Sequence, residues 1–217
     1  MFQKGEVMFK DRSHAAELLA QRLMPYKGQS PLILAIPRGA TPLGVVLAER
    51  LEGELDVVLV HKLCAPSQPE LAIGAIDEEG NAFISPHATS VGADPSWINA
   101  EKNRQFQVLQ RRRRQYSPLR TPIPVHHRVV IVVDDGLATG ATMQAALSAV
   151  RRGQPARLIC AAPVASSEAL ALVKPLADET VCLEVPTFFQ AVGQFYEQFP
   201  QISDEEVALC LQQAGQR

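Results

Sequence analysis

Two adjacent carboxylates and a threonine-flanked glycine turn lie close together beyond the middle of the chain. Asp134 and Asp135 follow the apolar run Val129 to Val133, and Thr139-Gly140-Ala141-Thr142 comes shortly afterwards. Free backbone N–H groups and hydroxyls at the start of a helix favour an anion such as phosphate. Carboxylates accept hydrogen bonds from hydroxyls. The pattern therefore predicts that the acids hold the ring hydroxyls of a ribose whose 5-phosphate lies on the turn.

The elements that must position these residues alternate along the chain. The run Val129 to Val133 is typical of an interior strand of a parallel sheet. Further strands are expected over 32–36, 56–60, 157–162 and 180–185, and helices over 13–23, 43–51, 95–116, 167–174 and 204–213. Ser13 is the expected N-cap of the first helix. This alternation predicts an α/β fold with a twisted, mainly parallel sheet flanked by helices.

Two stretches interrupt that alternation. The composition from Leu63 to about Gly80 changes to Pro, Gly and acids, which indicates a mobile loop. A connector with several prolines, over 117–124, leads into the strand that carries the acids.

Composition indicates an enzyme domain of the cytoplasm. The chain has 217 residues, of which 47% are hydrophobic, so it can bury a sizeable core within a single domain spanning 1–217. The net charge of −2 provides no global basic field for nucleic acid, and the charged N-terminal segment is neither a signal peptide nor a membrane span. Cys64, Cys160, Cys182 and Cys210 are scattered singly, so we expect reduced core residues and no zinc site.

The acid pair and the turn resemble the ribose-phosphate signature of the type I phosphoribosyltransferases. The resemblance implies that this family's core extends over the chain, with a flexible loop and helical insertion at 63–127 and a C-terminal hood and helix at 185–217. It implies transfer of 5-phosphoribosyl from phosphoribosyl pyrophosphate to a nitrogen acceptor, with magnesium as the cofactor. The ribose 5-phosphate would be bound by Asp134, Asp135, Ala138, Thr139, Gly140, Ala141 and Thr142.

The pyrophosphate of such a donor needs its own site. Ile36 to Ala40 ends a strand with a glycine-bearing turn, and Arg38 and Gly39 resemble the family's pyrophosphate loop. Lys62 stands where related enzymes carry a lysine before the catalytic loop, so the resemblance implies that it contacts pyrophosphate and acts as a catalytic residue beside the acid pair. His61, next to it, is either a weaker donor or a structural histidine.

The acceptor site is predicted near the C-terminus. Phe188 and Phe189, between a proline and a glycine, resemble the hood that sandwiches the base in 6-oxopurine phosphoribosyltransferases. Ordinary core packing of these two aromatic side chains is the alternative interpretation.

A second function class stays open. The whole chain resembles a bacterial group of stand-alone phosphoribosyltransferase-domain proteins, and some proteins of this fold bind the donor as regulators without turning it over. Arg111 to Arg114 is then the candidate contact with nucleic acid, although a four-residue run covers all faces of a helix. Retention of Arg38 and Lys62 together with a loop-sized insertion favours the enzyme. A homodimer is possible.

Overall fold

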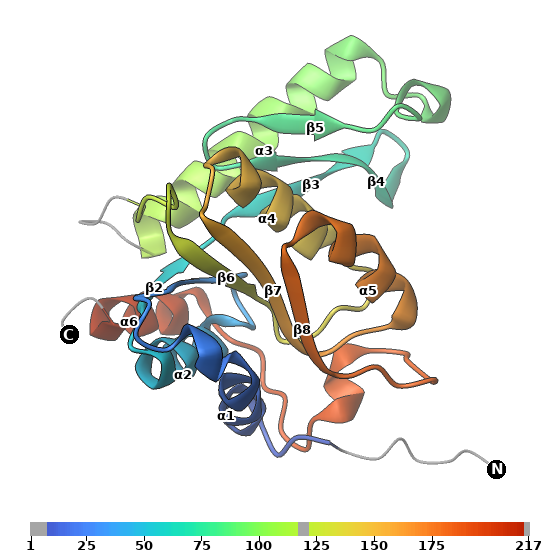
Figure 1. Cartoon of the computed structure of the whole chain (residues 1–217). Helices are drawn as coiled ribbons and strands as arrows, with labels where there is room; N and C mark the ends of the chain where they lie inside the picture. The colour runs from blue at the N-terminus through green and yellow to red at the C-terminus, as the bar shows by residue number, and fades with distance from the viewer. Residues whose placement is uncertain (1–7, 117–121, 215–217) are drawn as a thin grey trace.

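A five-stranded parallel sheet forms the centre of the molecule (Figure 1). The computed structural model describes residues 8–116 and 122–214. The strands are β1 (Leu32–Ala35), β2 (Glu54–Val57), β6 (Val129–Val133), β7 (Arg157–Val164) and β8 (Glu179–Glu184), in the order β2-β1-β6-β7-β8. The predicted α/β class with a mainly parallel sheet is confirmed.

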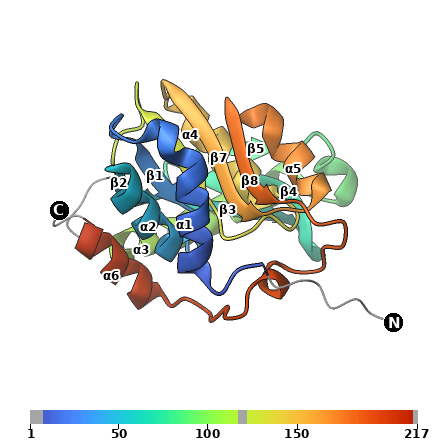
Figure 2. The same cartoon turned by 60° about the horizontal axis from the view of Figure 1, so that its bottom comes forward.

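Helices cover both faces of this sheet. Helices α1 (Arg12–Leu23) and α2 (Thr41–Leu51) lie on one face, and α4 (Ala141–Arg152) and α5 (Ser167–Val173) on the other (Figures 1 and 2). Side chains of a strand alternate between the two faces, so Ile131 and Val133 of β6 join the core beneath α1 and α2. Val130 and Val132 join the core beneath α4. This double burial explains why β6 is apolar throughout.

A second, antiparallel sheet replaces the loop predicted from Leu63 to Gly80. It consists of β3 (Val60–Ala65), β4 (Gln68–Asp77) and β5 (Ala82–Ile84) in that order. The prediction of a loop was wrong because the Pro, Gly and acidic residues are accommodated within and between paired strands. Leu63, Ile73 and Ile76 of this sheet are buried.

Helix α3 (Pro95–Tyr116) covers those apolar residues and has the bounds predicted from the sequence. Its last residue, Tyr116, donates a hydrogen bond to Asp204, the first residue of α6 (Asp204–Ala214). Helix α6 in turn packs against α2 (Figure 2). No helix of residues 8–116 and 122–214 is long and apolar enough to cross a bilayer.

Several element bounds differ from the predictions. The N-cap of α1 is Asp11 rather than Ser13, because the Asp11 carboxylate accepts a hydrogen bond of 2.8 Å from the backbone N–H of His14. The strand expected over 56–60 is β2, at 54–57, and the chain then enters β3. Most of the predicted connector, 117–121, lies outside the described residues. Of the four cysteines only Cys160 is fully buried, since the others lie partly at the surface.

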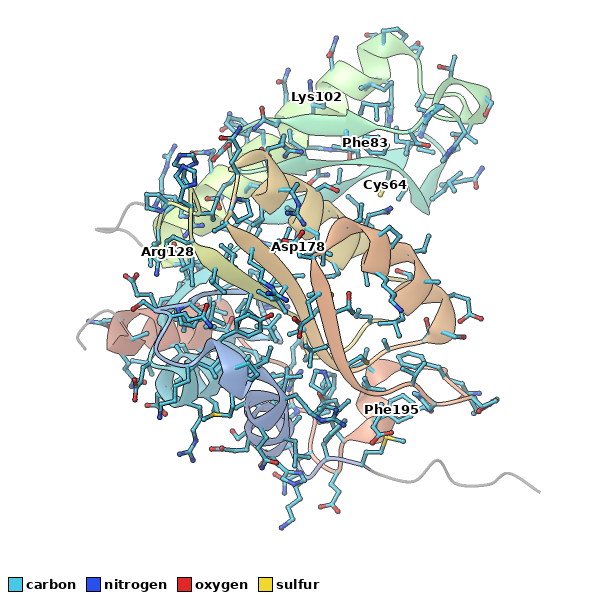
Figure 3. The ribbon with its side chains drawn as sticks, in the orientation of Figure 1. Cys64, Phe83, Lys102, Arg128, Asp178 and Phe195 are labelled. Atoms are coloured by element: carbon cyan, nitrogen blue, oxygen red, sulfur yellow. The ribbon has the colours of Figure 1, made fainter. Side chains whose placement is uncertain are left out.

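Short 3-10 helices complete the fold. They are η1 (Met24–Tyr26), η2 (Thr89–Val91), η3 (Lys174–Leu176) and η4 (Val192–Phe195). The last of these belongs to the segment after β8. This segment passes the residues just before α1, where Phe195 (Figure 3) packs in a small cluster with Phe9 and Tyr196.

Candidate functional site

The acid pair and the arginine turn meet at the carboxyl end of the central sheet. Strands β1 and β6 are parallel neighbours with Ala35 opposite Val133, so the segments that follow them leave the sheet side by side. Arg38 and Gly39 after β1 therefore line the same cavity, about 500 Å³ in volume, as Asp134 and Asp135 after β6. Ligand sites in open parallel sheets lie at this end of the strands.

The turn from Thr139 to Thr142, which the sequence predicts to bind phosphate and which is called the phosphate turn below, adjoins this cavity. A smaller hollow of about 150 Å³ is lined by the loop from Gly136 to Met143, and Asp134 and Thr142 line both spaces. Gly140 is the N-cap of α4 and has a φ of +74°, a backbone conformation that side chains disfavour. The Ala138 carbonyl is held by the Ser166 hydroxyl at 2.7 Å. The structure thus brings the predicted ribose and phosphate residues together.

The two carboxylates differ in their surroundings. Burial, followed by the charge of neighbouring Asp135, raises the pKa of Asp134 well above its ordinary value. One Asp134 oxygen accepts the backbone N–H of Asp135 at 2.9 Å. Asp135 forms an ion pair with Arg12, whose Nη2 lies 2.9 Å from Oδ2. A sugar hydroxyl at this site would therefore meet Asp135, which is paired with an arginine, and Asp134, which forms no ion pair with any described residue.

The sequence predicted no role for Arg12, which lies in the site. It lies 123 positions before Asp135, and its side chain is 8% exposed. Tyr196 was also missed, and its hydroxyl donates to the Asp135 carbonyl at 2.6 Å. An arginine at the start of an otherwise apolar helix face was the available signal, but it could not identify a partner so distant in the chain.

Gly39 is required by its close approach to the acids. A Cβ atom at this position would overlap the Asp135 carboxylate oxygen Oδ2. The peptide bond between Pro37 and Arg38 is cis, and the Arg38 carbonyl accepts the backbone N–H of Thr41 at 3.2 Å as α2 begins. The turn thus passes directly against the Asp135 carboxylate.

Lys62 lies elsewhere. It lines a cavity of about 520 Å³ between the antiparallel sheet and α4, together with Gln144, Ser148 and Arg152. Ala141, the first residue of α4, borders both this cavity and the phosphate turn. The structure therefore places Lys62 in a cavity that the first residue of α4 also lines, and apart from the cavity that contains Arg38 and Gly39.

The two candidate acceptor residues have different environments. Phe189 packs against Phe195, with ring centroids 5.1 Å apart, as the core-packing interpretation expected. Phe188 is 62% exposed, and neither phenylalanine lines the cavity at the acid pair. The cavity wall is instead made by Val192 and by the segment from Phe199 to Ile202.

The arginine run is divided between surface and interior. Arg113 is held by ion pairs to Asp56 and Glu78, whereas Arg111 and Arg114 are exposed. The run therefore does not form one continuous basic stripe.

The acids of the site suit a metal ion that is bound mainly through the phosphates of the substrate. No group of three or more His, Cys, Asp or Glu side chains that could hold a metal ion occurs in the described ranges, 8–116 and 122–214. Magnesium commonly binds through one or two carboxylates, water and substrate phosphates. Asp134 and Asp135 beside a phosphate turn are compatible with that mode.

Comparisons with known proteins identify the family of this chain. The family model of the phosphoribosyl transferase domain matches residues 10–200. Two Mycobacterium tuberculosis proteins, from strains H37Rv and CDC 1551 / Oshkosh, are named as candidate phosphoribosyl transferases and are 39% identical over 208 residues. The match covers 95% of this chain but 47% of each relative, so the chain spans about half the length of the curated relatives it matches.

A solved structure is similar over nearly its whole length. The crystal structure of TT1426 from Thermus thermophilus is 44% identical, with a TM-score of 0.86 over 95% of this chain and 98% of that one. The matched range of the family model includes the arginine turn, the acid pair and the phosphate turn. The chain therefore belongs to the phosphoribosyl transferase domain family.

Proposed function

We propose that this protein transfers the 5-phosphoribosyl group of phosphoribosyl pyrophosphate to a nitrogen acceptor of the nucleobase class and releases pyrophosphate. One observation carries the proposal: the acid pair and the Arg38-Gly39 turn line a single cavity, and the phosphate turn opens directly beside it. A hydroxyl-binding pair lies between two anion-binding turns, which matches a sugar that carries phosphate at one end and pyrophosphate at the other.

Each group has a distinct task in this reaction. The turn from Ala138 to Thr142 binds the 5-phosphate, and Asp134 and Asp135 accept hydrogen bonds from the ribose hydroxyls. The acceptor nitrogen attacks the anomeric carbon with its lone pair, while the bond from that carbon to the pyrophosphate oxygen breaks and its electron pair leaves with pyrophosphate. The proton of the acceptor nitrogen passes to solvent. Positive charge that develops on the sugar is stabilised by the nearby carboxylates.

Charge on the leaving group is compensated by the turn that passes against the acid pair. Arg38 provides a planar donor fork, and Gly39 lets the backbone approach the ligand. Bound magnesium would add charge neutralisation of the pyrophosphate. Lys62 is proposed as a second cation for pyrophosphate, and its position in the neighbouring cavity makes the Lys62→Met variant a separate test of that role. Phe188, exposed on the hood, is the proposed stacking residue for the acceptor ring.

The first experiment measures binding without turnover. Isothermal titration with ribose 5-phosphate should show binding that Asp135→Asn and Thr139→Ala each weaken by about tenfold, since each removes one charge-assisted or hydroxyl contact. Thr89→Ala, on the exposed helix η2, is the matched control and should bind as the unmodified protein does. Absence of ribose 5-phosphate binding in the unmodified protein would refute the proposal.

The second experiment distinguishes the enzyme from the regulator. Pyrophosphate release is followed with magnesium, phosphoribosyl pyrophosphate and a panel of purine and pyrimidine bases. Release with one base supports the transferase. Donor binding without release for any base, together with salt-dependent retention of DNA or RNA, would instead support the regulator. Sedimentation of the same samples tests the proposed homodimer.

A further inference from the structure

The guanidinium of Arg12 joins three parts of the chain around one carboxylate. Arg12 is the first residue of α1, and its Nε and Nη2 both lie near Asp135 Oδ2, at 3.0 and 2.9 Å. Its Nη1 donates to the Pro200 carbonyl at 2.8 Å. Its Cζ lies 3.7 Å from the centroid of the Phe199 ring. Contacts on its edges and on one face thus hold this buried side chain in a single orientation.

These contacts leave the two oxygens of Asp135 unequal. Both Arg12 contacts go to Oδ2, and the backbone of Gly39 lies so close to this oxygen that a Cβ there would overlap it. Among residues 8–116 and 122–214, no side chain of another residue donates a hydrogen bond to Oδ1. A guanidinium has a rigid planar shape and is weakly hydrated, so it can fix the plane of a carboxylate that a lysine would leave free to rotate.

We propose that Arg12 is a positioning residue for sugar binding. It holds Asp135 by Oδ2 so that Oδ1 is presented to a ribose hydroxyl, and it ties this carboxylate to the cavity wall at Phe199 and Pro200. The inference rests on the proposed function, because it takes Asp135 as a ligand of the sugar. Arg12 itself touches no reacting atom, so it acts through Asp135.

The test compares ribose 5-phosphate with inorganic phosphate as titrants. Arg12→Met should weaken ribose 5-phosphate binding by about tenfold, the usual scale for loss of a partner that orients a ligand-binding group. Binding of inorganic phosphate, which needs only the turn after Asp135, should stay unchanged. Arg12→Lys keeps the charge without the planar donor fork. Its affinity for ribose 5-phosphate should therefore lie between that of the unmodified protein and that of Arg12→Met. Arg22→Met, on the exposed side of α1, is the matched control and should bind both titrants normally.

One further readout separates positioning from a general effect on the fold. In an Asp135→Asn background, Arg12→Met should change ribose 5-phosphate affinity by less than about twofold, because the carboxylate that Arg12 orients is gone.

The outcomes are distinct. If Arg12→Met binds ribose 5-phosphate normally, or loses inorganic phosphate in the same proportion, the positioning role is overturned while the proposed function stands. An equal loss in the Asp135→Asn background also overturns it. If Arg12→Met does not fold, Arg12→Lys provides the same comparison. If the unmodified protein does not bind ribose 5-phosphate, both this inference and the proposed function fail.

Discussion

Arg113 provides the sharpest test of how the fold is held together. Its side chain is 11% exposed and lies between two acids, Asp56 of β2 and Glu78 beyond β4. Nη1 donates to Asp56 at 2.8 Å, and Nε and Nη2 donate to the two oxygens of Glu78 at 2.5 Å each. Nη2 also donates to the Val57 carbonyl at 2.9 Å. One residue thus connects α3 to both sheets.

The expected cost of Arg113→Met follows from the charges that it would leave behind. Asp56 is 3% exposed and Glu78 is 16% exposed, so the substitution leaves two poorly solvated carboxylates without their shared cation. Breaking a buried pair by removal of one partner costs about 3–5 kcal/mol. In a domain of this length, each kcal/mol lowers the melting temperature by about 2–4 °C, so we expect a decrease of roughly 6–20 °C.

Thermal and urea denaturation measure this loss. Arg114→Met removes an exposed arginine from the same helical turn and should change the free energy of unfolding by less than about 0.5 kcal/mol. The double variant Arg113→Met with Glu78→Gln should recover part of the loss, because one unpaired charge is then absent. A loss below about 1 kcal/mol for Arg113→Met would refute the reasoning that this contact is buried and structural.

Three further predictions concern the site. Burial and the charge of Asp135 raise the pKa of Asp134 in the folded state. At a pH between the unfolded-state and folded-state pKa values of Asp134, the folded protein therefore binds more protons than the unfolded chain. The free energy of unfolding falls as the pH rises through that window. Asp134→Asn should therefore raise the melting temperature at about pH 8 and leave it unchanged near the unfolded pKa of about 4, and a lower melting temperature at the higher pH would contradict this. Gly39→Ala should weaken phosphoribosyl pyrophosphate binding by more than about tenfold in a titration, since the new Cβ displaces the Asp135 carboxylate, and unchanged affinity would show that the turn has room. Phe189→Ala should lower the unfolding free energy by about 1–2 kcal/mol through lost packing on Phe195, whereas exposed Phe188→Ala should leave it unchanged in the same denaturation series.

The local part of the site could be predicted from the sequence because its groups are close together along the chain. Asp134 and Asp135 follow a strand whose apolar residues are unbroken, and the glycine turn follows within a few residues. Strand, turn and helix start are local properties that backbone sterics and hydrogen bonding set over short stretches. The alternation of such units also made the α/β class and the bounds of α3 predictable.

Other features could not be predicted because they depend on contacts between distant residues. The composition of the segment from Leu63 to Gly80 is typical of a loop, yet most of the segment lies in β3 and β4. These two strands pair with each other, and β5 pairs with β4. Helix α3 covers the apolar residues of this sheet. Cross-strand pairing of this kind depends on the partner strand and not on local propensity alone.

The sequence established the family resemblance, the class of fold and the acids and turn that would bind a ribose phosphate. Only the tertiary structure joined Arg12 to Asp135, placed Lys62 in a different cavity from Arg38, and packed Phe189 while leaving Phe188 exposed. The physical reason is that a buried ion pair or a cavity wall is made by side chains from several elements, and their meeting is decided by how those elements pack.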